Sequence, residues 1–247
     1  MRLCLAGTES VYTELRPMIK NVPYILQSYY YFCDWQKPLI HSADLFLLDS
    51  GAFTFMNSKG GNVNWNEYID KYIAFIKENG IKHYFELDID VITGYEEVKR
   101  IRAKIESETG IKSIPVWHKS RGIEEYKRLV QEYDYIAIGG IVTKEITKKD
   151  YPLLKRMVEY AYNNNVKVHG LGFTQKDASQ YKFYSVDSTS WKTLSRFGRL
   201  YKFDGEKMLT VTPKGKSINK AKYIIGERHN LKEWIKYQRY LNKGLTF

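Results

Sequence analysis

Cysteine is scarce in this sequence, and long hydrophobic runs are absent. Only Cys4 and Cys33 occur, with no CxxC pair, so the chain lacks both a disulfide framework and the thiolates of a structural zinc site. No apolar stretch approaches the ~20 residues that a membrane span needs. The first residues, MRLCLAG, are typical of a strand and show no signal-peptide pattern. We therefore expect a cytoplasmic protein.

Acidic residues are scarce in the last quarter of the chain. The 247 residues have a formal net charge of +11. From Lys192 to Phe247, 14 lysines and arginines stand against four aspartates and glutamates. A basic surface attracts phosphates through the release of counterions. A solvated face is the alternative, but charge this localised favours a nucleic-acid partner.

The sequence does contain a regular alternation of short apolar runs and longer amphipathic segments. Helical periodicity is present in Trp65–Asn79, Tyr95–Glu108, Ile123–Tyr133 and Tyr151–Asn164. Eight strands with helices between them predict a single-domain (β/α)8 TIM barrel, and an open doubly wound sheet is the structural alternative. The expected strands are Leu3–Ala6, Pro23–Gln27, Leu45–Leu48, Tyr84–Asp88, Ile114–Trp117, Tyr135–Ile138, Lys167–Leu171 and Phe183–Val186.

The pattern changes near Tyr201. A β-hairpin is predicted around Asp204-Gly205, followed by a loop at residues 213–219 and a last helix over Leu231–Leu241. We therefore expect a barrel of residues 1–199 and a basic hairpin-plus-helix C-terminal extension of residues 200–247 packed on it. The tyrosines at 201, 223 and 237 either stack on unpaired bases or pack in the core. The expected nucleic-acid contacts are Lys192, Arg196, Arg199, Lys232, Lys236 and Arg239.

Carboxylates gather where the expected strands end, which is where barrel enzymes carry their catalytic residues. Asp49, Asp88 with Asp90, and Asp187 belong to three different strand ends. Like charges in one pocket are unfavourable unless they share protons, hold a cation or take part in catalysis. Each one alone can instead cap the next helix, an explanation that is strongest for Asp187.

Histidines and glycines occupy the other strand ends. Gly139-Gly140 leaves room for a flat ligand. Gly170-Leu171-Gly172 leads into an expected helix near Thr174, whose N-terminus is suited to hold a phosphate. Paired carboxylates carry out glycosidic-bond chemistry. A second interpretation is a divalent-metal hydrolase, but no HxH or HExxH spacing supports it, and we predict neither a metal nor another cofactor. The metal ligands would be Asp49, Asp88, His118, His169 and Asp187.

Four short segments, in order along the chain, resemble motifs of the tRNA-guanine transglycosylase superfamily. The CxCxxC zinc motif of that family is missing, and the chain looks most like the zinc-free phage and bacterial 7-deazaguanine DNA transglycosylases. It departs from the family pattern at Ala52, Thr54 and Asp90, where Gly, Gln and Cys are usual. The segments are Asp49-Ser50-Gly51-Ala52-Phe53 (similar to DSGGFQ), Leu87-Asp88-Ile89-Asp90 (FDEC), Ile138-Gly139-Gly140-Ile141 (LGGL) and Val186-Asp187-Ser188-Thr189 (FDCVLPTR).

The resemblance implies an exchange of guanine in DNA for a free 7-deazaguanine base of the preQ0 or preQ1 type. Asp187 would be the nucleophile, Asp49 the general acid/base, and Asp88 the partner of the purine N–H edge. A tRNA substrate and a non-catalytic nucleic-acid-binding subunit remain alternatives. The other residues expected at the substrate are Ser50, Gly51, Asp90, His118, Gly139, Gly140, Ile141, His169, Gly170 and Gly172.

Overall fold

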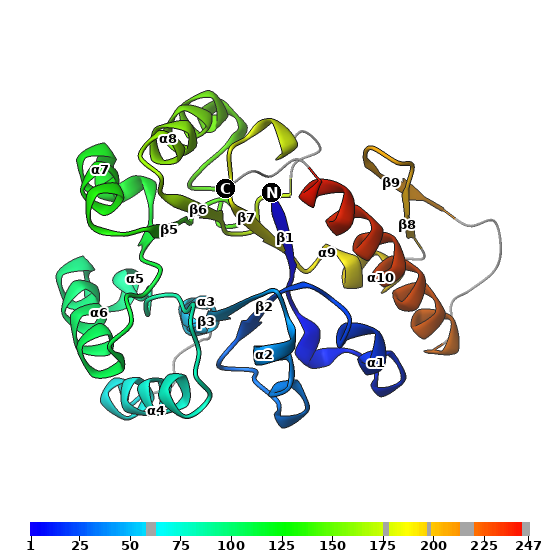
Figure 1. The fold of residues 1–247 in the computed structure, drawn as a ribbon, viewed down its shortest axis with the longest axis horizontal. Helices are drawn as coiled ribbons and strands as arrows, with labels where there is room; N and C mark the ends of the chain where they lie inside the picture. The colour runs from blue at the N-terminus through cyan, green and yellow to red at the C-terminus, as the bar shows by residue number, and fades with distance from the viewer. Residues whose placement is uncertain (58–62, 175–177, 197–198, 213–219, 244–247) are drawn as a thin grey trace.

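A curled parallel sheet forms the centre of the molecule, with helices around its outside (Figure 1). The structure is a computed structural model and describes residues 1–57, 63–174, 178–196, 199–212 and 220–243. The seven strands run in the order β3-β2-β1-β7-β6-β5-β4. They are β1 (Arg2–Leu5), β2 (Tyr24–Ser28), β3 (Leu45–Asp49), β4 (Val116–Trp117), β5 (Tyr135–Ile138), β6 (Lys167–Gly170) and β7 (Ser185–Ser188).

The two edge strands, β3 and β4, are connected through Tyr84 and Phe85. Tyr84 makes a parallel bridge with Leu48, and Phe85 makes one with Ile114. The Ile114 N–H donates to the Tyr84 carbonyl at 2.7 Å. These are isolated bridges, because the chain turns just beyond them, where the Ile89 N–H donates to the Leu87 carbonyl at 3.0 Å. The α/β class and the curled parallel sheet are therefore confirmed, whereas a full (β/α)8 barrel is not.

The predicted amphipathic helices are present with nearly the expected bounds. In α4 (Trp65–Glu78) the buried residues Ile69, Tyr72, Ile73 and Ile76 repeat at spacings of three and four, which places them on one face. The main outer helices are α4, α6 (Tyr95–Thr109), α7 (Gly122–Glu132) and α8 (Tyr151–Asn163). Shorter ones are α1 (Arg16–Ile19), α2 (Leu39–Ser42), α3 (Ala52–Asn57), α5 (Asp90–Thr93) and α9 (Ser190–Arg196).

The predicted C-terminal hairpin and helix are also present. β8 (Leu200–Phe203) and β9 (Met208–Val211) pair antiparallel, and α10 (Lys220–Asn242) begins well before the predicted Leu231. The helix packs on β8, α9 and β1 (Figure 1), so it lies against the first strand of the sheet. The predicted loop at 213–219 lies outside the described residues. None of the helices described is both long and apolar enough to cross a membrane.

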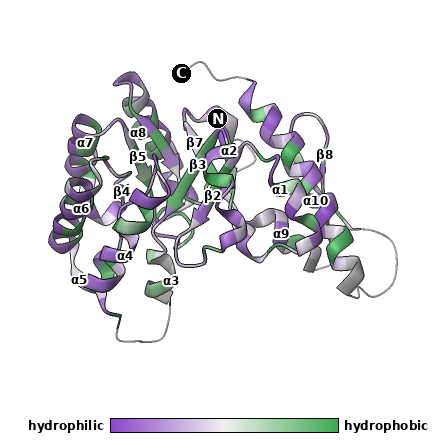
Figure 2. Ribbon diagram, turned by 60° about the horizontal axis from the view of Figure 1, so that its bottom comes forward, coloured by the Kyte–Doolittle hydropathy of each residue, from purple (hydrophilic) through white to green (hydrophobic). Residues whose placement is uncertain are grey.

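The two faces of the sheet bury different apolar residues. Leu3 and Leu5 of β1 pack with the outer helices, while Cys4 and Ala6 join a second cluster built from strand residues. This alternation follows from the two-residue repeat of a strand. Figure 2 shows hydrophobic strands inside and hydrophilic residues along the outer helices. The inner cluster fills the concave side of the sheet and leaves its carboxyl end open.

Candidate active site

A cavity of about 470 Å³ lies at the carboxyl ends of the strands. Asp49, Asp88 and Asp187 all line it, although they come from three separate segments of the chain. The fold therefore brings the three predicted carboxylates together in one cavity. Of the other predicted residues, Ser50, His118, Gly139, Gly140 and Gly172 line it, while Gly51, Asp90, Ile141, His169 and Gly170 do not.

Asp187 presents one engaged and one unengaged carboxylate oxygen. Its Oδ1 accepts the Gly172 N–H at 2.7 Å and lies 3.3 Å from His169 Nε2. The buried His169 is itself held by Ser185, whose Oγ lies 2.6 Å from Nδ1. Oδ2 makes no hydrogen bond to the part of the chain that the structure describes. Asp187 does not cap α9, because the Ser190 N–H donates to Ser188 Oγ at 3.1 Å instead.

Asp49 ends β3 and is placed to exchange a proton near neutral pH. Its Oδ2 accepts the Gly51 N–H at 3.1 Å. Burial raises the pKa of Asp49 to about 6, helped by the charges of Asp187 and Asp88 and opposed by the Gly51 N–H. The following loop is fixed by Tyr68, whose hydroxyl donates to the Ser50 carbonyl at 2.6 Å.

Asp88 is paired with His118, and both residues line the cavity. His118 Nε2 lies 2.6 Å from Asp88 Oδ2, and its Nδ1 lies 3.0 Å from Glu145 Oε2. Burial disfavours the imidazolium, but the hydrogen bond and charge of Asp88, with Glu145, raise the pKa of His118 to about 9. Burial alone would raise the pKa of Asp88, yet His118 and Arg121 hold it below its usual value. Asp88 is therefore an ionised acceptor at neutral pH.

The two glycines after β5 make room for this pair. A Cβ on Gly139 would lie 2.7 Å from His118 Cε1. Gly140 has a φ of +83°, and a Cβ there would lie 2.8 Å from Glu145 Oε2. From the sequence, we expected these glycines to leave room for a flat ligand. The structure adds a second reason, which is the close approach of His118 and Glu145.

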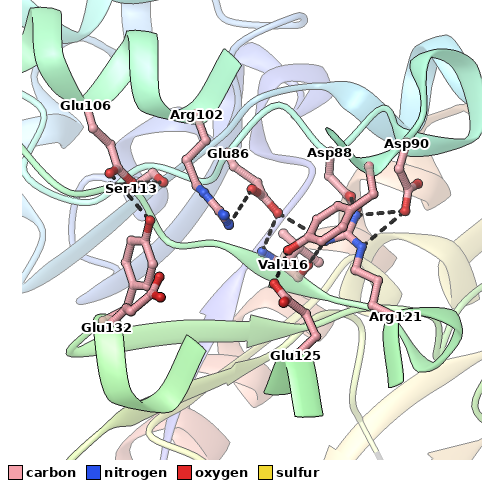
Figure 3. A network of polar contacts seen from close by, with 12 residues as sticks. Glu86, Asp88, Asp90, Arg102, Glu106, Ser113, Val116, Arg121, Glu125 and Glu132 are labelled. Atoms are coloured by element: carbon pink, nitrogen blue, oxygen red, sulfur yellow. Dashed lines mark hydrogen bonds and ion pairs between the residues drawn. The ribbon is translucent and has the colours of Figure 1, made fainter. Parts of the chain in front are cut away.

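A buried network of arginines and carboxylates lies behind Asp88 (Figure 3). Arg121 Nη2 lies 2.5 Å from Asp88 Oδ1 and 2.8 Å from Asp90 Oδ2. Its Nη1 lies 3.3 Å from Glu86 Oε1, and Arg102 Nη1 lies 3.1 Å from Glu86 Oε2. Burial raises the pKa of Glu86 to about 7 despite Arg102. Asp90, expected at the substrate, instead holds Arg121.

Sequence reasoning missed both arginines, because each lies in or next to a helix whose charged residues are mostly solvated. A signal was nevertheless present. Glu86, Asp88 and Asp90 alternate through an otherwise buried run, and buried carboxylates need cations or donors. The pattern therefore predicts that these carboxylates have cationic partners, but it does not indicate which residues the partners are.

The expected nucleic-acid contacts separate into two groups. Lys192 is buried, and its ammonium donates to the Gly7 carbonyl at 3.1 Å and to the Ser10 hydroxyl, so its place does not suit a phosphate contact. The Arg196 side chain lies outside the described residues.

Tyr201 and Tyr237 pack against Trp234, with ring centroids 5.3 and 6.2 Å away. The exposed cations are Arg199, Lys232, Lys236 and Arg239, here called the basic face.

Two further findings bear on identity. Within the described ranges, no group of three or more His, Cys, Asp and Glu side chains is arranged to hold a metal ion. No protein-family model matches the chain, and no curated protein matches it in sequence. The likeness to the transglycosylases therefore stays a prediction that rests on the four strand-end segments.

Proposed function

We propose that this protein is a pentosyltransferase that exchanges guanine in DNA for a 7-deazaguanine base of the preQ0 or preQ1 type, on a (β/α)8-type barrel. One observation carries the proposal: three carboxyl groups in one cavity differ in their electrostatic state. Asp187 has an unengaged oxygen among the described contacts, Asp49 has a pKa of about 6, and Asp88 is held ionised. Base exchange requires a nucleophile, a proton carrier and a base-binding acceptor, in that order.

In the first step, Asp187 Oδ2 attacks C1′ of the target deoxyguanosine. The C1′–N9 bond breaks, and the protonated form of Asp49 supplies the proton that guanine takes with it. The products are free guanine and an ester between Asp187 and the sugar. His169 and Gly172 hold Oδ1 throughout and so keep Oδ2 directed at the sugar. A target base in a duplex must first be unstacked, at a cost of a few kcal/mol.

In the second step, the 7-deazaguanine base replaces guanine in the cavity. Ionised Asp49 removes the proton from N9 of this base, and N9 attacks C1′ from the face that guanine left. The Asp187 ester bond breaks, which regenerates the carboxylate. Two displacements at C1′ retain its configuration. Asp49 ends the cycle protonated, ready for the next guanine.

Base recognition is assigned to Asp88. An ionised carboxylate accepts hydrogen bonds and donates none, so it suits the N–H edge of a guanine-type base. A volume of about 470 Å³ falls in the range of small-molecule sites. It is sufficient for one base with its sugar.

DNA is proposed as the polymer partner because positive charge is concentrated on the basic face. Lysine and arginine bind phosphate without reading sequence, so the basic face would give affinity and position while the cavity selects the base. The missing zinc motif argues for a docking surface unlike that of the tRNA-acting relatives.

The test is incorporation of labelled guanine into DNA and tRNA of matched concentration, side by side. We expect faster incorporation into DNA. Faster incorporation into tRNA would replace DNA by the tRNA alternative. DNA binding with no incorporation into either polymer would leave the non-catalytic binding subunit.

A further inference from the structure

We infer that Arg121 is a positioning residue for base recognition, which fixes the orientation of Asp88 and keeps it a pure hydrogen-bond acceptor toward the incoming base. The inference rests on the proposed function, in which Asp88 receives that base. Arg121 itself does not line the cavity, so it acts only through the carboxylates it holds.

The guanidinium of Arg121 is anchored on every side that the structure describes (Figure 3). Nη2 donates to Asp88 Oδ1 at 2.5 Å, and Nε and Nη2 donate to Asp90 Oδ2 at 3.1 and 2.8 Å. Nη1 donates to Glu86 and to the Val116 carbonyl. The Tyr95 ring centre lies 4.1 Å from the guanidinium carbon. A planar fork with this many partners has one orientation.

Asp88 is therefore held at both oxygens by cations from outside its own segment. Oδ1 is bound by Arg121, which precedes α7, and Oδ2 is bound by His118, which follows β4. Two contacts on different oxygens set the plane of the carboxylate. Base recognition depends on that plane, because the remaining lone pairs must meet the donors of the base.

Removing Arg121 would leave Asp88 among like charges. Glu86 and Asp90 flank it in its own segment, and Asp49 and Asp187 line the same cavity. Glu145 lies behind His118, and Arg102 of α6 is bound to Glu86. Among the described residues, only His118 would remain as a directly bonded cation of Asp88. Like charges and burial both favour the neutral acid, and a protonated Asp88 would donate where the base also donates.

The experiment compares Arg121→Met and Arg121→Lys with the wild type by calorimetric titration of 7-deazaguanine between pH 6 and 8. The matched control is Arg100→Met, because Arg100 is an exposed arginine of α6 that pairs with Glu97 at 2.6 Å. We expect Arg121→Met to bind the base roughly 10- to 100-fold more weakly at pH 7. Its affinity should recover as the pH rises, because Asp88 ionises again. Arg121→Lys, which keeps the charge but loses the fork, should lie between.

Steady-state exchange adds a second measurement, since Arg121→Met should raise KM for the base more than KM for DNA. Asp90→Ala removes one anchor of Arg121 and keeps the guanidinium, so it should give a smaller loss in the same direction, and it serves if Arg121→Met does not fold. Wild-type base affinity in both Arg121→Lys and Asp90→Ala would overturn the inference, as would a pH-independent loss in Arg121→Met or an equal loss in Arg100→Met. A wild-type protein that binds no 7-deazaguanine would overturn the proposed function itself.

Discussion

The cavity and the basic face have opposite charge and hold it in different ways. The acids that line the cavity are Glu9, Asp49, Glu86, Asp88 and Asp187, and no lysine or arginine of the described residues lines it. The cations of the basic face are exposed along α10 and before β8. We therefore expect a phosphate backbone to be repelled by the cavity and attracted by the basic face.

The cavity and the basic face also differ in burial. Substitutions in the cavity should therefore have larger effects than substitutions on the basic face. Inside the cavity Asp49, Asp88 and Asp187 each have a hydrogen-bonding partner at short range. Little water screens them, so one substitution has a large effect. On the basic face, salt screens each charge and contributions are small and nearly additive. Chemistry and polymer affinity should therefore respond to different substitutions.

The largest effect is expected for Asp187→Asn. An amide is no nucleophile toward C1′, so exchange of labelled guanine should fall by at least about 1,000-fold. DNA binding should persist, because the basic face is untouched. Exchange rates and filter binding on the same preparation measure both. Near-normal exchange by this variant would remove Asp187 from the chemistry.

The next effect is expected for Asp49→Asn, which removes the proton carrier. Exchange should fall by roughly 100- to 10,000-fold, and the wild-type rate should show an ionisation near pH 6 that the variant lacks. A wild-type pH–rate profile without any ionisation between pH 5 and 7 would contradict the role given to Asp49.

The Asp49→Asn substitution should raise the stability of the folded protein at high pH, although it lowers the rate of exchange. Its pKa is raised on folding from 3.8 to about 6, so its contribution to stability is complete below about pH 4 and is lost as the pH rises through 6. Asp49→Asn carries no such charge. It should raise the free energy of unfolding at pH 8 by about 3 kcal/mol and by little at pH 4. Urea unfolding at the two pH values checks this, and equal effects at both would contradict the pKa shift.

A smaller effect, confined to base binding, is expected for Asp88→Ala. Loss of an ionised acceptor should weaken 7-deazaguanine binding by roughly 10- to 100-fold, while DNA affinity changes little. Calorimetry measures the affinity for the free base, and filter binding measures the affinity for DNA. Unchanged base affinity would take Asp88 out of base recognition.

The basic face should respond mainly to salt. Combined replacement of Lys232, Lys236 and Arg239 by Ala should lower the slope of log affinity against log salt by about 0.9 for each cation that binds a phosphate, with base affinity unchanged. The control removes the same charge from the far side of the molecule (Figure 1). It replaces three lysines of α4, α6 and α7 by Ala: Lys71 and Lys127, which are exposed, and Lys104, which is half-buried. An equal slope change in both triple variants would mean that the basic face has no special role.

The sequence predicted buried regular structure well and buried charge poorly. The run ending at Asp49 was recognised because a strand buried on both faces is continuously apolar, and it forms β3 (Leu45–Asp49). Tyr84–Asp88 looked similar, but Glu86 and Asp88 turn toward Arg102 and Arg121, and only isolated bridges remain. Which arginine meets which carboxylate depends on tertiary packing and leaves no periodic pattern.

The start of α10 was missed for a local reason. Gly226 is a poor helix former and interrupts the pattern before Leu231. In the structure a Cβ at Gly226 would lie 3.1 Å from Ser195 Cβ, so the glycine allows α10 to approach α9 closely. The same local view counted Lys192 as a surface cation, although it is buried against the β1 loop. Sequence spacing indicates which face a residue shares, but not what covers that face.

The central claim, a covalent bond between Asp187 and the sugar, is tested most directly by intact-mass measurement after acid quenching of the protein with a guanine-containing oligonucleotide. The predicted result is a species with the mass of protein plus oligonucleotide minus guanine, absent in Asp187→Asn and mapped by digestion to the peptide that contains Asp187. An adduct that persists in Asp187→Asn, or one that maps to another carboxylate, would contradict the account.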